Sequence, residues 1–139
     1  MDEYTERLAQ AQGYLEELLN SKRYDFDGLK PSDLQEDYPV VYAIFDKADG
    51  TCLYVEKTKR LRQRLYTNHL MGKENSARLK KYLTEDPDRG FKDNMAAAKK
   101  FLKDHCYFQY FHVEDKRLRG QLEGLFSYLL DVKYIEEEH

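Results

Sequence analysis

The stretch that decides the fold is VVYAIFDKADGTCLYVEKT, which spans residues 40–58. Both of its halves are rich in apolar, β-branched and aromatic residues, which favour strands. Between them lies Asp49-Gly50, a dipeptide typical of tight turns. The stretch therefore predicts a β-hairpin in which Tyr42 and Tyr54 face each other on neighbouring strands.

Helical periodicity precedes this hairpin. In residues 2–20 apolar side chains recur at alternating spacings of four and three, and Asp2 is a suitable N-cap. The apolar positions are Tyr4, Leu8, Ala11, Leu15 and Leu18. Because the stripe covers fewer than three heptads and the helix contains Gly13, we expect it to pack on its own domain rather than in a coiled coil.

The remaining segments alternate between helical and strand patterns. Helices are predicted at 59–69, at 76–83 with Ser76 as N-cap, at 93–104 and at 115–131, and a third strand at 106–113. This order predicts an α+β fold, with a small three-stranded antiparallel sheet flanked by helices and an extra N-terminal amphipathic helix. Residues 1–38 would form that helix and a connecting segment, 39–135 the main domain, and 136–139 a tail.

The net charge of −3 conceals a strong asymmetry along the chain. Residues 57–81 contain nine basic residues and one acid, Glu74, so this segment carries +8 and the rest of the chain −11. A basic segment in an otherwise acidic protein suits the binding of a polyanion on one face. The residues predicted to bind nucleic acid are Lys59, Arg60, Arg62, Asn68, Lys73, Arg78, Lys80 and Lys81.

The two cysteines, Cys52 and Cys106, lie far apart and lack the spacing of a zinc site, so we expect buried thiols in a reducing compartment. The sequence has neither a signal peptide nor an apolar run of about 18 residues. We therefore expect a cytoplasmic protein without a membrane partner, and a monomer is favoured.

The hairpin carries Val40-Val41-Tyr42 on its first strand and Tyr54-Val55-Glu56 on its second, followed by Lys57 and Arg64. This pattern resembles the signature of the GIY-YIG nucleases over about residues 39–134. The resemblance implies a divalent-metal-dependent endonuclease that hydrolyses phosphodiester bonds in DNA.

The same resemblance implies roles for individual residues. It assigns catalysis to Tyr42, Tyr54, Lys57 and Arg64, and His69 is a further catalytic candidate. It makes Glu123 the metal ligand, for one Mg²⁺ or Mn²⁺ ion that is weakly bound without substrate.

Elementary chemistry supports these roles and leaves alternatives open. Arg64, held by packing of its helix, could bind a phosphate through two N–H groups and neutralise charge in the transition state, or it could belong to a solvated basic face. A tyrosine that acts as general base needs neighbouring cations or a metal to lower its pKa from about 10. Glu123 could bring its carboxylate to the sheet edge, or it could be an exposed helical glutamate.

Three positions depart from the family pattern. Val40 replaces the first glycine, and Ile135 stands where many relatives carry asparagine. Glu56 replaces the last glycine of the second tripeptide and places a negative charge beside the expected phosphate, which would weaken binding unless Glu56 serves as an extra metal ligand.

Glu56 is thus a possible inactivating substitution, and three functions remain open. The chain could be an endonuclease, a catalytically weakened GIY-YIG-like module that binds nucleic acid, or a protein-interaction module that uses its first helix.

Overall fold

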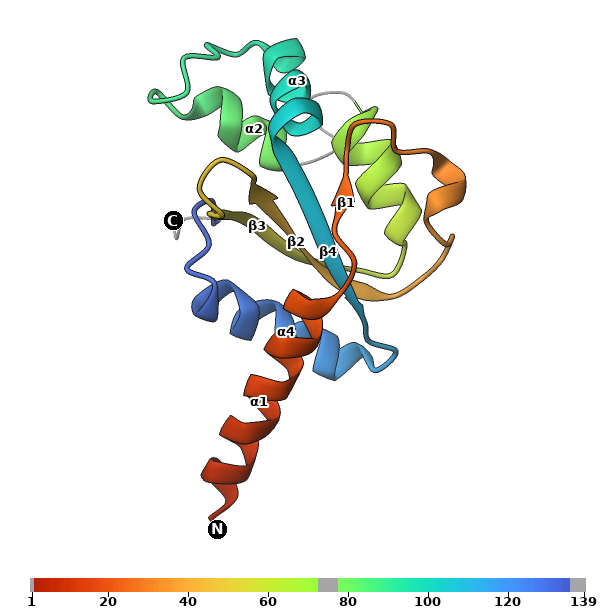
Figure 1. Ribbon diagram of the computed structural model, residues 1–139, viewed down its shortest axis with the longest axis vertical. Coiled ribbons are helices and arrows are strands. Elements are labelled where there is room, and N and C mark those ends of the chain that lie inside the picture. The colour runs from red at the N-terminus through yellow and green to blue at the C-terminus, as the bar shows by residue number, and fades with distance from the viewer. Residues whose placement is uncertain (1, 73–77, 136–139) are drawn as a thin grey trace.

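The computed structural model describes residues 2–72 and 78–135. The predicted cap Ser76, the predicted nucleic-acid contact Lys73 and the tail 136–139 lie outside these residues. Within them the chain forms an antiparallel sheet covered by helices on both faces (Figure 1), and the predicted α+β class is confirmed.

The sheet has the strand order β1-β4-β2-β3 within the described part of the chain. Its long strands are β2 (Val40–Asp46), β3 (Cys52–Thr58) and β4 (Cys106–His112), which correspond to the three predicted strands. A fourth strand, β1 (Tyr24–Asp25), pairs with β4 and was not predicted, because two residues are too few to show an alternating pattern.

The β2–β3 hairpin closes where the sequence predicts it. Gly50 has a φ of 75°, in the region that favours glycine, and its N–H donates to the Asp46 carbonyl at 2.9 Å. The predicted facing of Tyr42 and Tyr54 is wrong, however. A register irregularity between Ile44 and Phe45 places Tyr42 opposite Glu56, so that Tyr54 lies diagonally from Tyr42 on the same face.

Strand alternation divides the core into two layers. Even-numbered residues of β2, such as Tyr42 and Ile44, pack beneath η2 (Gln63–Leu70), α2 (Arg78–Glu85) and α3 (Met95–His105). Odd-numbered residues of β2 pack on the other face, against α1 (Glu3–Asn20) and α4 (Lys116–Leu129).

Side-chain caps define several helix ends. Asp2 accepts the Thr5 N–H at 2.8 Å at the start of α1, Asn94 accepts the Ala97 N–H at the start of α3, and Asp115 caps α4. A short 3₁₀ turn, η1 (Pro31–Asp33), lies in the segment before the sheet. The helix predicted at 59–69 is present, but η2 is a π-helix rather than an α-helix.

Helix α1 only partly meets the prediction that it packs on its own domain. Its C-terminal end is anchored, because Leu18 is buried and Gln109 of β4 donates to the carbonyls of Leu19 and Ser21. Its first turns are exposed throughout and project away from the body (Figure 1). Tyr4 is 77% exposed and Leu8 is 71% exposed, so the apolar stripe continues into solvent.

The segment after α4 returns to the edge of β3. The N–H groups of Lys133 and Tyr134 donate to the carbonyls of Cys52 and Leu53 at 3.0 and 3.1 Å. The Tyr134 hydroxyl donates to Asp86 at 2.7 Å and accepts from Nε of Arg89 at 2.9 Å. These contacts hold the end of the described chain against the sheet.

Across residues 2–72 and 78–135, the helices are all too short or too polar to cross a bilayer.

Candidate active site

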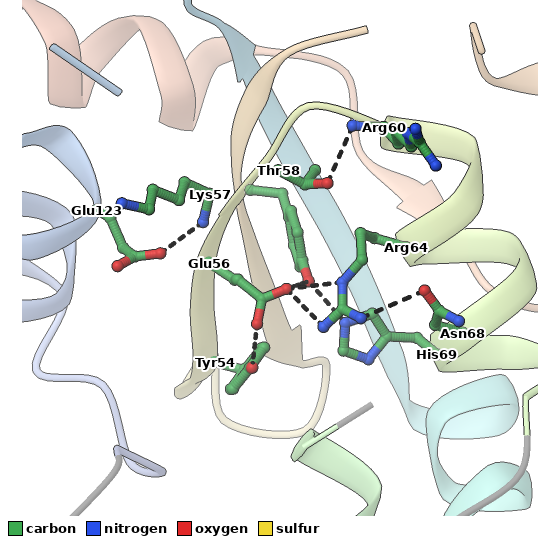
Figure 2. Close-up of polar contacts among 10 residues, drawn as sticks. Tyr54, Glu56, Lys57, Thr58, Arg60, Arg64, Asn68, His69 and Glu123 are labelled. Atoms are coloured by element: carbon green, nitrogen blue, oxygen red, sulfur yellow. Dashed lines mark hydrogen bonds and ion pairs between the residues drawn. The ribbon is translucent and has the colours of Figure 1, made fainter. Parts of the chain in front are cut away.

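The even-numbered face of the hairpin gathers several predicted site residues around Glu56. Its Oε1 accepts from the Tyr42 hydroxyl at 2.9 Å and from Nε of Arg64 at 2.8 Å. Its Oε2 accepts from the Tyr54 hydroxyl at 2.5 Å, and Nη2 of Arg64 lies 2.7 Å from Oε1. Figure 2 shows this carboxylate between Tyr54 and Arg64.

The π-helical turn of η2 determines which side chains reach this centre. A π-helix bonds residue i to i+5, so side chains five positions apart lie on one side of it. From η2, Arg64 reaches Glu56 and His69 reaches Tyr42, and Nη1 of Arg64 donates to Asn68 at 3.2 Å. Leu61 and Leu65 are fully buried and hold η2 against the sheet. This agrees with the prediction that packing of its helix holds Arg64 in place.

His69 is fully buried beneath this centre. Its Nε2 lies 2.7 Å from the Tyr42 hydroxyl, and its ring meets Tyr42 and Tyr54 edge-on, with centroids 5.6 Å apart in both pairs. Burial, with Arg64 and Lys80 nearby, lowers the pKa of His69 well below its usual value of 6.5. Because the Tyr42 hydroxyl donates to Glu56, the neutral imidazole donates from Nε2, and the buried Nδ1 has no hydrogen-bond partner in the described structure.

The two phenols are hydrogen-bond donors in this arrangement rather than bases. Burial raises the pKa of Tyr42 well above 10, and the negative charge of Glu56 raises it further. The pKa of Tyr54 rises for the same two reasons. A tyrosine acting as general base needs the opposite shift, so Glu56 changes the chemistry of the site as well as its shape.

Arg64 is well placed to bind an anion. Burial by itself would lower the pKa of its guanidinium, but Tyr42 and Glu56 raise it above its usual value, so Arg64 remains a cation. Its side chain is 25% exposed and that of Glu56 is 18% exposed, so the ion pair is partly shielded from water. Arg64 therefore contributes to the site rather than to a solvated basic face.

Glu123 lies at the edge of the same strand. Its Oε2 accepts the backbone N–H of Lys57 at 2.7 Å, which places the carboxylate on the open side of β3 (Figure 2). A groove of about 850 Å³ runs along this edge, and Tyr54, Glu56 and Glu123 line it. The sequence-based placement of Glu123 at the sheet edge agrees with this position.

The donor set at this edge fits the implied ion only in part. Glu123 supplies one carboxylate, and Mg²⁺ can bind through one or two carboxylates when water and substrate phosphates complete its shell. Within residues 2–72 and 78–135, no three His, Cys, Asp or Glu side chains come together as a ligand set. Both oxygens of Glu56, the other candidate ligand, already accept hydrogen bonds from the chain itself.

Lys57 does not join the group around Glu56. It pairs with Val41 across the hairpin, so its side chain leaves the sheet on the odd-numbered face. A Cβ atom on Gly120 of α4 would lie 3.5 Å from the Lys57 Nζ, which puts the ammonium beside that helix. The sequence pattern placed Lys57 near the phosphate because it follows Tyr54 closely, but strand alternation turns the two side chains apart.

The predicted nucleic-acid contacts do not form one uniform basic face. Arg62 donates to Glu36 at 2.5 Å and to the Leu34 carbonyl at 2.9 Å, and Arg60 lies 3.7 Å from Asp37. Acids from the segment before the sheet therefore offset part of the positive charge of residues 57–81. The exposed basic side chains of the described segment include Lys59, Arg60, Arg78 and Lys81.

Lys80 departs further from the predicted role. It is 1% exposed, and its ammonium donates to the Gly72 carbonyl. Burial, helped by the charge of Lys99, lowers the pKa of Lys80 to about 8. Its place beside Leu79 and Leu83 on the buried face of α2 explains why it does not reach a ligand at the surface.

Sequence reasoning identified Glu56 as a departure but missed its partners. The signal was available, because Glu56 lies two residues after Tyr54 on one strand and both side chains therefore share a face. The contact with Arg64 depends on how η2 crosses the sheet, which no local pattern predicts.

Comparison with known proteins gave no match to any protein-family model, curated protein or solved structure.

Proposed function

We propose that this chain is a catalytically weakened GIY-YIG-like domain that binds DNA through its phosphodiester backbone. One observation carries the proposal: Arg64, Tyr42 and Tyr54 direct their donors at a single anionic group, the carboxylate of Glu56. Donors arranged in this way suit the oxygens of a phosphate equally well, because guanidinium groups bind carboxylates and phosphates with the same geometry.

The same carboxylate weakens catalysis in this proposal. A substrate phosphate has to displace Glu56 from Arg64, and Glu56 is always present because it belongs to the same chain. While Glu56 stays in place, the positive charge of Arg64 is offset and cannot stabilise charge that develops on a phosphate. The raised pKa values of Tyr42 and Tyr54 also keep both phenols protonated.

A second candidate function is the divalent-metal-dependent DNA endonuclease that the resemblance implies. The observation that favours it is the groove along β3, which Tyr54, Glu56 and Glu123 line together. Glu123 would hold one Mg²⁺ or Mn²⁺ ion there, and the ion would polarise a phosphate oxygen and favour ionisation of an attacking water.

Nicking of supercoiled DNA in Mg²⁺ or Mn²⁺ separates the two candidates. The natural chain is compared with Glu56→Gly, Glu56→Gln and the double variant Glu56→Gly/Glu123→Ala, and circular dichroism checks that each variant is folded. We expect little or no cleavage by the natural chain, metal-dependent cleavage by Glu56→Gly, and loss of that cleavage in the double variant.

DNA binding is measured in parallel, by fluorescence anisotropy at several salt concentrations. Efficient cleavage by the natural chain that is lost in Arg64→Ala would favour the endonuclease. Salt-dependent binding without cleavage by any variant would support the nucleic-acid-binding role and overturn the endonuclease. Absence of binding by all folded variants would overturn both candidates.

A further inference from the structure

The most exposed apolar surface outside the candidate site is the first half of α1. Tyr4 and Leu8 lie on one face of this helix, on the same stripe as Ala11, Leu15 and the buried Leu18. A helical segment that projects from the body without packing is only marginally stable in water. The stripe at Tyr4 and Leu8 is therefore expected to gain stability from a covering surface.

The same stripe forms one wall of a groove. This groove has a volume of about 470 Å³ and lies between α1 and α4. Its apolar lining includes Tyr4, Leu8 and Tyr14 of α1 and Leu118, Leu122 and Leu125 of α4, and Arg7 is the charged residue that lines it. The exposed side chains of Tyr4 and Leu8 therefore belong to the same continuous patch as the groove, and they could fill the equivalent groove of another copy.

We propose that a second copy of this chain occupies the groove, with α1 of each copy packed between α1 and α4 of the other. A patch that holds both the projecting side chains and the groove is self-complementary. Two-fold pairing therefore fills the groove and covers the apolar stripe of both copies at once, and it closes the assembly at a dimer. The result is a four-helix arrangement that covers Tyr4 and Leu8 in each copy.

Charge at the margins of the patch supports this occupant. Glu3 borders the stripe on α1 and Arg117 borders the apolar face of α4, and both side chains are exposed. Asp115 and Glu114 already have local roles, because Asp115 caps α4 and Glu114 pairs with His112 at 3.2 Å. Arg7 lines the groove on α1 and has the same sign as Arg117, so Glu3 is the border group of α1 that can pair with Arg117. Packing α1 of one copy against α4 of the other would bring groups of opposite charge to the border of the interface.

Sedimentation velocity and equilibrium over a range of protein concentrations test the proposal. We expect the natural chain to shift from monomer to dimer as concentration rises, and Leu8→Glu to raise the dimer dissociation constant by at least about tenfold. Ala9→Glu is the matched control, because it adds the same charge to the opposite face of α1 and should leave the dissociation constant within about twofold.

Charge reversal supplies an independent variant. Arg117→Glu should weaken the dimer, and adding Glu3→Arg should restore part of the lost affinity. A natural chain that stays monomeric at every concentration would overturn the proposal, as would a dimer that Leu8→Glu and Ala9→Glu affect equally. The proposal does not depend on nucleic-acid binding, so a failed nicking assay leaves it unaffected.

Discussion

The Oε1 atom of Glu56 lies 2.8 Å from Nε and 2.7 Å from Nη2 of Arg64, so two donors of one guanidinium converge on a single carboxylate oxygen. The GIY-YIG signature, which the hairpin resembles, has glycine at the place of Glu56, and glycine offers no side chain to such an arginine. The substitution therefore adds a partner for Arg64 as well as a negative charge.

Replacement of Glu56 by glutamine tests the strength of this contact. The pair is partly shielded from water, so we expect Glu56→Gln to lower the free energy of unfolding by about 1–2 kcal/mol in urea denaturation. The control is Glu36→Gln, whose partner Arg62 is similarly close but whose own side chain is 72% exposed. That variant should lose no more than about 0.5 kcal/mol, and equal losses would show that the contact of Glu56 is not special.

The buried His69 predicts a pH dependence of stability. Its pKa in the folded protein is depressed below the unfolded value, so below about pH 6.5 the unfolded chain binds more protons than the folded one. The contribution of His69 to stability should therefore be constant above that pH and fall as the pH drops below it, by up to about 1.4 kcal/mol per pH unit.

Urea denaturation of the natural chain, His69→Gln and His112→Gln between pH 5 and 8 measures this effect. His69→Gln should be less stable at neutral pH and should show a shallower slope in the acidic range. His112 is exposed, so its replacement should leave the slope as it is. An unchanged slope in His69→Gln would mean that the slope has another origin.

Lys80 and Lys81 are neighbours on α2, but Lys80 is buried and Lys81 is exposed, so the two can be compared for their effect on DNA binding. Lys81→Met should weaken DNA binding by a few-fold and make it less dependent on salt, because an exposed ammonium can contact a phosphate. Lys80→Met should leave both quantities nearly unchanged, because Lys80 is buried and donates to Gly72. Fluorescence anisotropy at several salt concentrations compares the two variants, and an equal loss would place Lys80 in contact with DNA.

The contact of Tyr134 with Asp86 and Arg89 predicts a stability effect beside the groove along β3, which Tyr134 also lines. Tyr134→Phe removes the hydroxyl from both contacts, so we expect a loss of about 1–2 kcal/mol in thermal or urea unfolding. Tyr128→Phe changes the same group on a side chain that is 83% exposed, and it should have little effect. Similar stabilities for the two variants would show that the hydroxyl of Tyr134 contributes nothing.

The sequence predicted the elements with strong periodicity and missed those that depend on how elements cross. The hairpin at Asp49-Gly50 and the helices around Leu102 and Leu122 follow from local patterns, and the structure contains each of them. Local pattern could not predict β1, because its two residues show no alternating pattern and its partner β4 lies far along the chain.

The predicted residues of the candidate site likewise fall into two groups, those that the structure brings together and those that it does not. Tyr42, Tyr54, Arg64 and His69 come together on one face, and Glu123 reaches the edge of β3. Lys57 and Lys80 belong to the basic segment of the sequence, but their side chains do not reach the candidate site. Strand alternation turns Lys57 to the other face of the sheet, and helix periodicity turns Lys80 to the buried face of α2. In α2, the spacing of Lys80 to Leu83 and Thr84 was a usable sign of its burial, since all three are buried on one face.

The π-helical form of η2 determines which residue of that helix lies beneath Tyr42. A π-turn holds one more residue than an α-turn, so deletion of one residue, such as Thr67, could let η2 relax to ordinary α-helical winding. His69 would then be the fourth residue after Arg64, a spacing that α-helical winding keeps on one face, so it would still lie beneath Tyr42. Without a deletion, α-helical winding would put Asn68 at that spacing, so the extra residue of the π-turn determines that a histidine rather than Asn68 lies beneath Tyr42.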